Sequence, residues 1–198
     1  MSEIETNIEE FWSEENKKIY NDVMTRVIDR LYEINDDWYE KNGNHPIRFV
    51  ESRLKSPESI KNKIIRKGRL SQQKSPDMII NDLAGVRAIC YDVKQVYMIA
   101  GKIKQTPEFD VIKEKDYISK PKSNGYQSYH IILKIKEVKV ELQIRTIIMD
   151  AWSSLETILI YKKTNPIPKD LENNVKKISK WSMKIDSMVD EILEKNGV

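Results

Sequence analysis

The chain has 198 residues, which is enough for one well-cored domain with helical additions and too few for two full enzyme domains. Its 34 lysines and arginines stand against 31 acidic residues, so the net charge of +3 neither indicates nor excludes a nucleic-acid partner. The single cysteine, Cys90, excludes an internal disulfide, and no apolar run reaches the roughly 20 residues that span a bilayer. We therefore expect a cytoplasmic protein without a membrane partner, since the acidic N-terminus also lacks the pattern of a signal peptide.

The first part of the chain predicts an amphipathic helix. Between Ser13 and Asn42 apolar residues recur every three to four positions, and Gly43 follows as a natural helix stop. Residues 45–55 then predict a short strand or extended segment.

The middle of the chain predicts a helix followed by a β-α unit. The helix is expected over residues 56–68, where Ser56 is a good N-cap and Gly68 suits the exit. A strand is expected over 82–92 and a further helix over 93–105.

The second half of the chain predicts a hairpin and a helix. Residues 119–128 are rich in turn formers, and residues 129–135 and 138–146 are candidate strands joined by a short polar connection. Helical spacing returns over 147–162, and the sequence TNPIP at 164–168 breaks it.

The last segment predicts a helix with heptad-like spacing. Such a helix packs either on the rest of the chain or on another copy of it, and the sequence leaves both arrangements open. The positions that follow this spacing are Leu171, Val175, Ile178, Ser182, Ile185, Val189 and Ile192.

The strand at 138–146 alternates strictly, with apolar side chains on one face and Glu141 among polar side chains on the other. The polar face is either a solvated edge or the wall of a cleft. A second carboxylate, Asp82, comes directly before a separate predicted strand, where it could also serve as an N-cap. Two carboxylates from neighbouring strands are what Mg²⁺ needs when phosphate oxygens supply the remaining ligands.

Basic residues lie on both sides of Asp82 in the sequence and would suit a polyphosphate. A charge run is usually a solvated helix face, and Lys61 and Lys67 fit that description. Arg53 and Arg87 differ, because each projects from a predicted strand, where a planar guanidinium can stack on a base. The candidate phosphate and base ligands are Arg53, Lys55, Lys63, Arg66, Lys67 and Arg87.

The turn-rich segment carries a further group of candidates. Gly125 permits a tight turn, and Tyr126 beside it is either a stacking platform for a base or an ordinary packing residue. Lys122 and His130 could reach phosphates. Other site classes lack their residues, because the chain has no glycine-rich phosphate loop and only His45, His130 and one cysteine as soft metal ligands. Metal-assisted phosphoryl-type transfer remains.

Five segments together resemble the synthetase domain of the RelA/SpoT homologues, specifically the single-domain small alarmone synthetases. They are SRLKSPESIKNKIIRKG, NDLAGVRAIC, KDYISKPKSNGYQSYH, VELQIRT and MDAWSSLETILIYK, in order along residues 44–163. The resemblance implies an α/β fold with a nucleotidyltransferase-like mixed β-sheet flanked by helices. Residues 1–43 would then be an N-terminal helical extension and 164–198 a C-terminal helix.

The resemblance implies an ATP pyrophosphokinase that moves the β,γ-pyrophosphate of ATP to the ribose 3′-hydroxyl of GDP or GTP, making (p)ppGpp. Asp82 and Glu141 would hold Mg²⁺, and Glu141 would also activate the 3′-hydroxyl. Arg53 and Arg87 would sandwich adenine. The phosphates of ATP would be bound by Lys55, Lys63 and Arg66.

On the acceptor side, the resemblance implies that Tyr126 stacks on the base. The acceptor would also be bound by Lys122, His130 and Lys115. The site around Glu141 would be supported by Gln143 and Arg145. The chain has no His-Asp pair adjacent in sequence, so synthesis without degradation is implied.

Departures from the family pattern leave the acceptor open. Gln127 stands where members often have arginine, Thr157 stands where they often have histidine, and Lys115 precedes DYI. The alternative acceptor is the 3′-terminal adenosine of tRNA, which would make the protein a translation-blocking toxin with an antitoxin partner. A catalytically idle nucleotide- or RNA-binding regulator is a third reading, and the flanking helices could mediate self-association.

Overall fold

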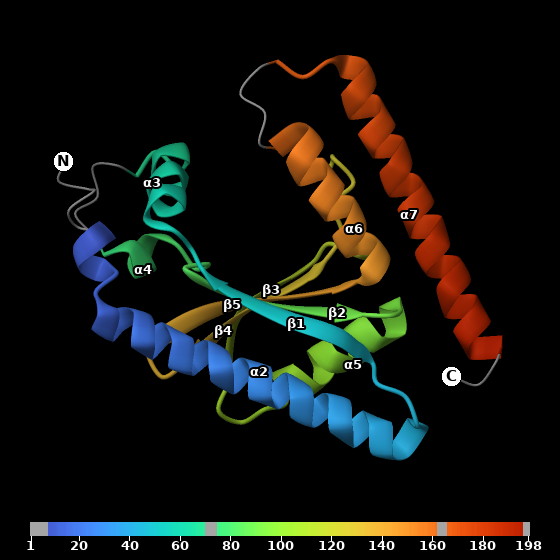
Figure 1. The fold of residues 1–198 in the computed structure, drawn as a ribbon, viewed down its shortest axis with the longest axis horizontal. Helices are drawn as coiled ribbons and strands as arrows, with labels where there is room; N and C mark the ends of the chain where they lie inside the picture. Colours follow the sequence, from blue (N-terminus) through green and yellow to red (C-terminus); the bar gives the residue numbers. More distant parts are fainter. Residues whose placement is uncertain (1–7, 70–74, 162–165, 196–198) are drawn as a thin grey trace.

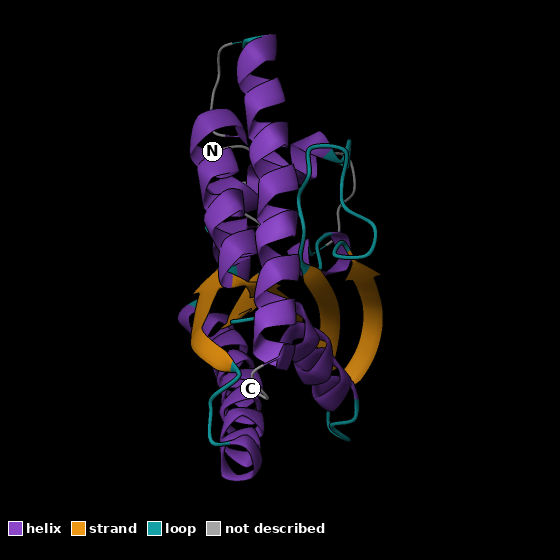
Figure 2. Ribbon diagram, turned by 90° about the vertical axis from the view of Figure 1, so that its right-hand side faces the viewer, coloured by secondary structure: helices purple, strands orange, loops and turns teal. Residues whose placement is uncertain are grey.

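The computed structural model describes residues 8–69, 75–161 and 166–195, and its centre is a mixed β-sheet with helices on both faces (Figure 1, Figure 2). The strand order is β1-β2-β5-β4-β3, in which β2 and β5 run parallel and the other neighbours antiparallel. The predicted α/β class, with a mixed sheet flanked by helices, is confirmed. The strands are β1 (Ile47–Leu54), β2 (Ala84–Cys90), β3 (Asp110–Asp116), β4 (Tyr129–Ile135) and β5 (Val138–Thr146).

The helices follow the predicted order, with one additional helix and one change of helix type. The short helix α4 was not predicted, and the helix expected over 147–162 changes to a π-helical turn at Thr157. The helical elements are α2 (Glu14–Asn42), α3 (Pro57–Arg66), α4 (Pro76–Ile79), α5 (Val93–Lys104), α6 (Ile147–Glu156), the π-turn (Thr157–Tyr161) and α7 (Lys169–Lys195). No helix in these described ranges is long and apolar enough to cross a membrane.

Local capping sets the helix boundaries, with Gly43, Ser56 and Gly68 in the roles that the sequence predicted and Ser13 as a further cap. The Ser13 side chain accepts a hydrogen bond from the Asn16 backbone at the start of α2, and Gly43 ends that helix with a φ of 73°. Ser56 caps α3 in the same way, and Gly68, with a φ of 62°, lies just beyond its end.

One face of the sheet forms the hydrophobic core with α2 and α5, which lie together below the sheet in Figure 1. Alternate residues of β2 and β5 point into this core, while their neighbours point to the opposite face. The buried core residues from these elements include Val23, Val27 and Leu31 of α2, Val96, Ile99 and Ile103 of α5, and Val86, Ala88, Val140, Leu142 and Ile144 of the sheet. The second face therefore carries the polar side chains.

Helices α3, α6 and α7 lie on this second side of the sheet (Figure 1). Helix α7 packs within the same chain, because the Trp152 indole of α6 donates to the backbone oxygen of Val175 at 3.1 Å. The heptad-like spacing describes the packed face only in part, since Ile185 is 45% exposed and Ile192 is 56% exposed. The buried residues are Val175 and Ser182, which follow that spacing, and Ser179 and Asp186, which do not. The predicted boundary between residues 163 and 164 lies outside the described residues.

Candidate active site

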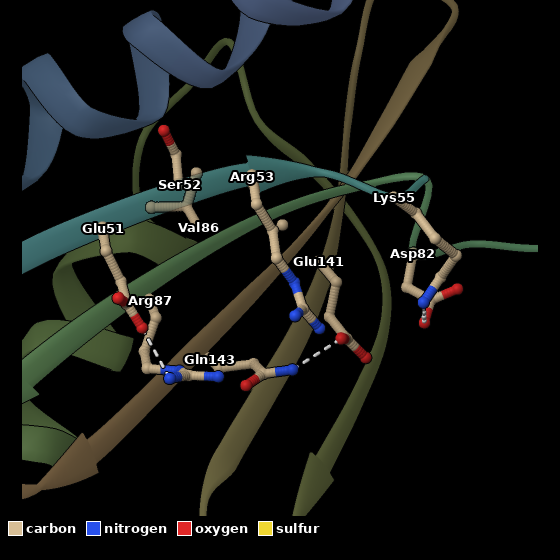
Figure 3. Close-up of a pocket in the computed structure, with 10 residues that line it drawn as sticks. Glu51, Ser52, Arg53, Lys55, Asp82, Val86, Arg87, Glu141 and Gln143 are labelled. Carbon is tan, nitrogen blue, oxygen red and sulfur yellow. Dashed lines mark hydrogen bonds and ion pairs between the residues drawn. The ribbon is translucent and has the colours of Figure 1, made fainter. Parts of the chain in front are cut away.

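A cleft of about 1070 Å³ lies over the polar face of the sheet, and its lining comes from β1, β2, β4, β5, α3, α6 and the loop 119–128. Figure 3 shows how side chains from three strands and Asp82 gather at one part of it. Most predicted site residues line this cleft, namely Arg53, Lys55, Lys63, Arg66, Asp82, Arg87, Lys122, Tyr126, His130, Glu141 and Gln143.

The strand register explains why these residues meet. Gly85 of β2 pairs with Arg53 of β1 on one side and with Glu141 of β5 on the other, so the three share one face of the sheet. A Cβ at Gly85 would make only ordinary contacts with backbone oxygens, at 3.9 and 4.0 Å. A larger side chain there would project between Arg53 and Glu141, and glycine keeps that space open.

Arg87 is placed two residues beyond Gly85 and pairs with Gln143 across the same face. Arg53 and Arg87 therefore project side by side from neighbouring strands, as Figure 3 shows. Two guanidinium groups on the same face of the sheet in one cleft are compatible with the predicted role in binding a base.

Asp82 is held by two cations at the edge of the cleft. Its Oδ2 atom forms ion pairs with Lys63 of α3 and, at 3.3 Å, with Lys55. Its Oδ1 atom is buried and has no hydrogen-bond partner among the described residues. Because a buried unpaired carboxylate oxygen is costly, this atom is suited to accept a further cationic ligand.

Mg²⁺ fits this donor set in combination with a nucleotide. The described residues contain no cluster of three or more His, Cys, Asp or Glu side chains that could hold a metal ion. Asp82 and Glu141 line the same cleft, however, and Mg²⁺ is often bound by one or two carboxylates together with substrate phosphates and water. These two residues would be its protein ligands.

Glu141 and four other side chains form a closed ring of hydrogen bonds. His130 Nδ1 lies 3.2 Å from one Glu141 oxygen, and Gln143 donates to the other at 2.7 Å. Arg145 donates to the Gln143 carbonyl at 2.6 Å and to the Tyr126 hydroxyl at 2.9 Å. The Tyr126 hydroxyl lies 2.8 Å from His130 Nε2, which closes the ring.

The chemistry of the groups fixes the direction of these bonds. Burial opposes the ionisation of Glu141, but bonds from His130 and Gln143 outweigh it and hold its pKa well below the ordinary value. The ionised carboxylate only accepts, so His130 donates from Nδ1. Burial lowers the pKa of His130 despite the attraction of Glu141, and its neutral ring therefore accepts at Nε2 from Tyr126.

Arg145 is the buried support of this ring, with 2% of its side chain exposed. It was predicted as a supporting residue and does not line the cleft. A carboxylate that sequence reasoning missed, Asp150 in the first turn of α6, lies 3.3 Å from Arg145 and also 3.3 Å from Arg87. Arg87 is held by Glu51 as well, at 2.5 Å. Asp150 thus connects the predicted ATP side of the cleft to the ring around Glu141.

The loop side of the cleft is built around Tyr126. The Lys122 ammonium lies 4.4 Å from the centre of the Tyr126 ring and 4.6 Å from that of Tyr117. Lys115 lies on the edge strand β3 and pairs with His130, so it shares the cleft face of the sheet without lining the cleft. Stacking of Tyr126 on an acceptor base, and a contact from Lys115, stay predictions.

Comparison with known proteins agrees with this geometry. A family model described as a region found in RelA / SpoT proteins matches residues 52–166. The chain therefore belongs to the RelA/SpoT family. The matched region contains every predicted site residue and ends before α7, and the resemblance noted in the sequence is confirmed.

Relatives in the RelA/SpoT family match almost the whole chain. The GTP pyrophosphokinase YwaC of Bacillus subtilis is 36% identical over 194 residues, which cover 94% of this chain and 91% of the relative. The GTP pyrophosphokinase YjbM of the same organism is 31% identical over 178 residues, which cover 86% and 80%.

Solved structures of this family show the same fold. The small alarmone synthetase 2 of Bacillus subtilis matches with a TM-score of 0.81 at 34% identity, over 93% of this chain and 99% of that chain. The small alarmone synthetase 1 of Bacillus subtilis, bound to its product pppGpp, matches with a TM-score of 0.79 at 29% identity, over 89% and 93%.

Proposed function

We propose that the chain is an ATP pyrophosphokinase that transfers the β,γ-pyrophosphate of ATP to the ribose 3′-hydroxyl of GDP or GTP, forming (p)ppGpp. The observation that carries this proposal is the cleft in which Asp82 and Glu141 face a wall of cations, in a chain similar along its length to two GTP pyrophosphokinases. A polyphosphate with about four negative charges requires several cationic side chains to bind it.

The reaction is an in-line displacement at phosphorus. The 3′-oxygen of the acceptor forms a bond to the β-phosphorus of ATP, and the bond from that phosphorus to the α,β-bridging oxygen breaks. AMP leaves with the bridging oxygen, and the 3′-hydroxyl loses its proton. Mg²⁺, held by Asp82 and Glu141, would neutralise charge on the phosphate oxygens.

The chain's own residues supply position and charge for this step. Lys55, Lys63 and Arg66 bind the phosphates of ATP in the proposal, and Arg53 and Arg87 hold its base. All of them line one wall of the cleft, and Tyr126 lies on the loop that contributes another part of the lining. Two nucleotides can then meet above Glu141.

Glu141 accepts the proton of the 3′-hydroxyl in this proposal. Its depressed pKa keeps it ionised at neutral pH, which makes it available but a weak base. Phosphoryl transfer passes through a loose transition state in which the nucleophile needs little activation, so a weak and well-placed base is sufficient.

One of the departures from the family pattern, Gln127, lies outside the cleft. This residue is 8% exposed, and its amide donates to the backbone oxygen of Ile118 at 3.3 Å. It stabilises the loop from inside and does not line the cleft. Because Gln127 does not line the cleft, the glutamine at this position does not remove a contact to the acceptor in this proposal. Thr157, the other position that differs from the family pattern, does line the cleft.

The test is transfer from γ-labelled ATP to GDP, GTP and deacylated tRNA in separate reactions with Mg²⁺. Label on a guanosine nucleotide together with released AMP supports the proposal. Label on tRNA alone would replace it by the tRNA-modifying reaction, and transfer to none of the three would leave a binding role.

A further inference from the structure

Helix α7 contacts the loop that carries Tyr126, although α7 lies beyond the region that the family model matches. The Ser179 hydroxyl on its inner face donates to the backbone oxygen of Gly125 at 3.0 Å. Ser179 is 3% exposed, so this bond is shielded from water. The contact joins residues 54 positions apart in the chain.

Gly125 is the residue that makes this contact possible. Its φ of 93° lies in the region that favours glycine, and a Cβ there would lie 2.1 Å from the Ser179 Oγ atom. The backbone of the loop and the surface of α7 therefore approach as closely as a glycine allows. Ser179 fits against the loop and bonds to it at the same point.

The attachment of α7 to the rest of the fold does not depend on the loop. In its first half the Val175 backbone oxygen accepts from the Trp152 indole of α6 at 3.1 Å. Near its end Asp190 accepts from the backbone of Val93 at 3.0 Å, at the start of α5. Because α7 is fixed at both of these points, it can serve as a rigid support for the loop.

Backbone hydrogen bonds within the loop connect Gly125 to Tyr126. The Gly125 backbone donates to Lys122 at 2.8 Å, and Lys122 in turn donates to the Tyr126 backbone oxygen at 3.1 Å. The neighbouring Asn124 donates to Glu156 of α6 at 3.1 Å. These backbone bonds couple the position of Gly125 to that of Tyr126.

We propose that Ser179 is a positioning residue for the acceptor nucleotide, acting through the backbone of Gly125 on Tyr126. This inference rests on the proposed function, which assigns GDP or GTP as the acceptor. Helix α7 is then part of the acceptor site, and ATP binding, which uses β1, β2 and α3, is independent of it.

The test compares Ser179→Ala with Ser182→Ala. Ser182 is a buried serine of the same helix whose hydroxyl bonds to Ile178 within α7, at 3.0 Å. Loss of one shielded hydrogen bond should raise the KM for GDP or GTP by about 3- to 10-fold in Ser179→Ala, with the KM for ATP within about twofold of wild type. Ser182→Ala should leave both constants near wild type.

The proposal would be overturned if Ser179→Ala changed the KM values for acceptor and ATP equally or changed neither. It would also be overturned if Ser182→Ala raised the KM for the acceptor as much as Ser179→Ala does. Amide hydrogen exchange gives a second measurement that needs no substrate. The amides of Gly125 and Tyr126 should exchange faster in Ser179→Ala than in wild type or Ser182→Ala, and equal rates would count against the support. Absence of transfer by the wild-type protein would overturn the proposed function instead, and the exchange experiment would still decide the role of Ser179.

Discussion

Replacing Asp186 by asparagine should stabilise the protein by an amount that depends on pH. Asp186 lies on the inner face of α7 and is 3% exposed, and neither carboxylate oxygen has a hydrogen-bond partner among the described residues. Burial raises its pKa from 3.8 to about 6, and the charges of Asp190 and Asp92 add to this rise; the Thr146 hydroxyl opposes it, although its position does not satisfy hydrogen-bond geometry.

The magnitude follows from the difference in proton affinity. With a pKa of 3.8 in the unfolded chain and about 6 in the folded one, the folded state binds the proton more tightly, so stability falls as pH rises through this window. A tenfold change in affinity is worth about 1.4 kcal/mol, which gives a loss of about 3 kcal/mol above pH 7. Asparagine has a similar shape and no charge, so it avoids this loss.

Urea denaturation of wild type and Asp186→Asn measures the effect. The variant should be more stable by about 3 kcal/mol at pH 8 and by less than about 1 kcal/mol at pH 4. Asp170→Asn, an exposed change in the first turn of α7, should alter stability by no more than about 0.5 kcal/mol. A gain that does not change with pH, or a loss at pH 8, would refute the reasoning, because the charged carboxylate would then have a favourable partner.

Three further substitutions test the site itself. Glu141→Gln removes the charge and keeps the shape, so transfer should fall by at least about 100-fold while ATP binding, measured by calorimetry, persists; near-normal turnover would exclude Glu141 as the base. Tyr126→Phe removes one of the hydrogen-bond acceptors of the buried Arg145, which costs about 1–3 kcal/mol, so the melting temperature should fall and the KM for the acceptor nucleotide should rise; if both stay at wild-type values, the ring is not required. Asp150→Asn should raise the KM for ATP more than Glu51→Gln does, because the Asp150 side chain is 21% exposed and that of Glu51 52%; the reverse order would contradict the structural role of Asp150.

Local sequence patterns were sufficient to predict most of the fold. Ser56, which was predicted as an N-cap, caps α3 through a bond to a backbone group three residues away, so the signal is contained in a short window. The alternation over 138–146 required only that one face of β5 be buried, and this placed Glu141, Gln143 and Arg145 together on the other face.

The residues that the sequence did not predict depend on contacts between distant segments. Asp150 lies five residues after Arg145, but its position beside both arginines depends on the angle at which α6 leaves the sheet. Tyr126 was predicted as a stacking platform, and the bond from Arg145 to its hydroxyl spans 19 residues of sequence. The inner face of α7 was predicted only in part from apolar spacing, because Val175 and Ser182 are buried as expected, whereas the buried Ser179 and Asp186 do not follow that spacing.

The parallel pairing of β2 with β5 has a consequence for folding while the protein is being synthesised on the ribosome. Ala84 of β2 pairs with Val140 of β5, and β3 and β4 lie between them in the chain. During synthesis Asp82 therefore emerges long before Glu141, and the loop around Gly125 emerges before the helix that supports it. Pairings between such distant segments form late. A nascent chain that has not passed β5 cannot bring the two carboxylates together, so the candidate site is incomplete until β5 has been synthesised.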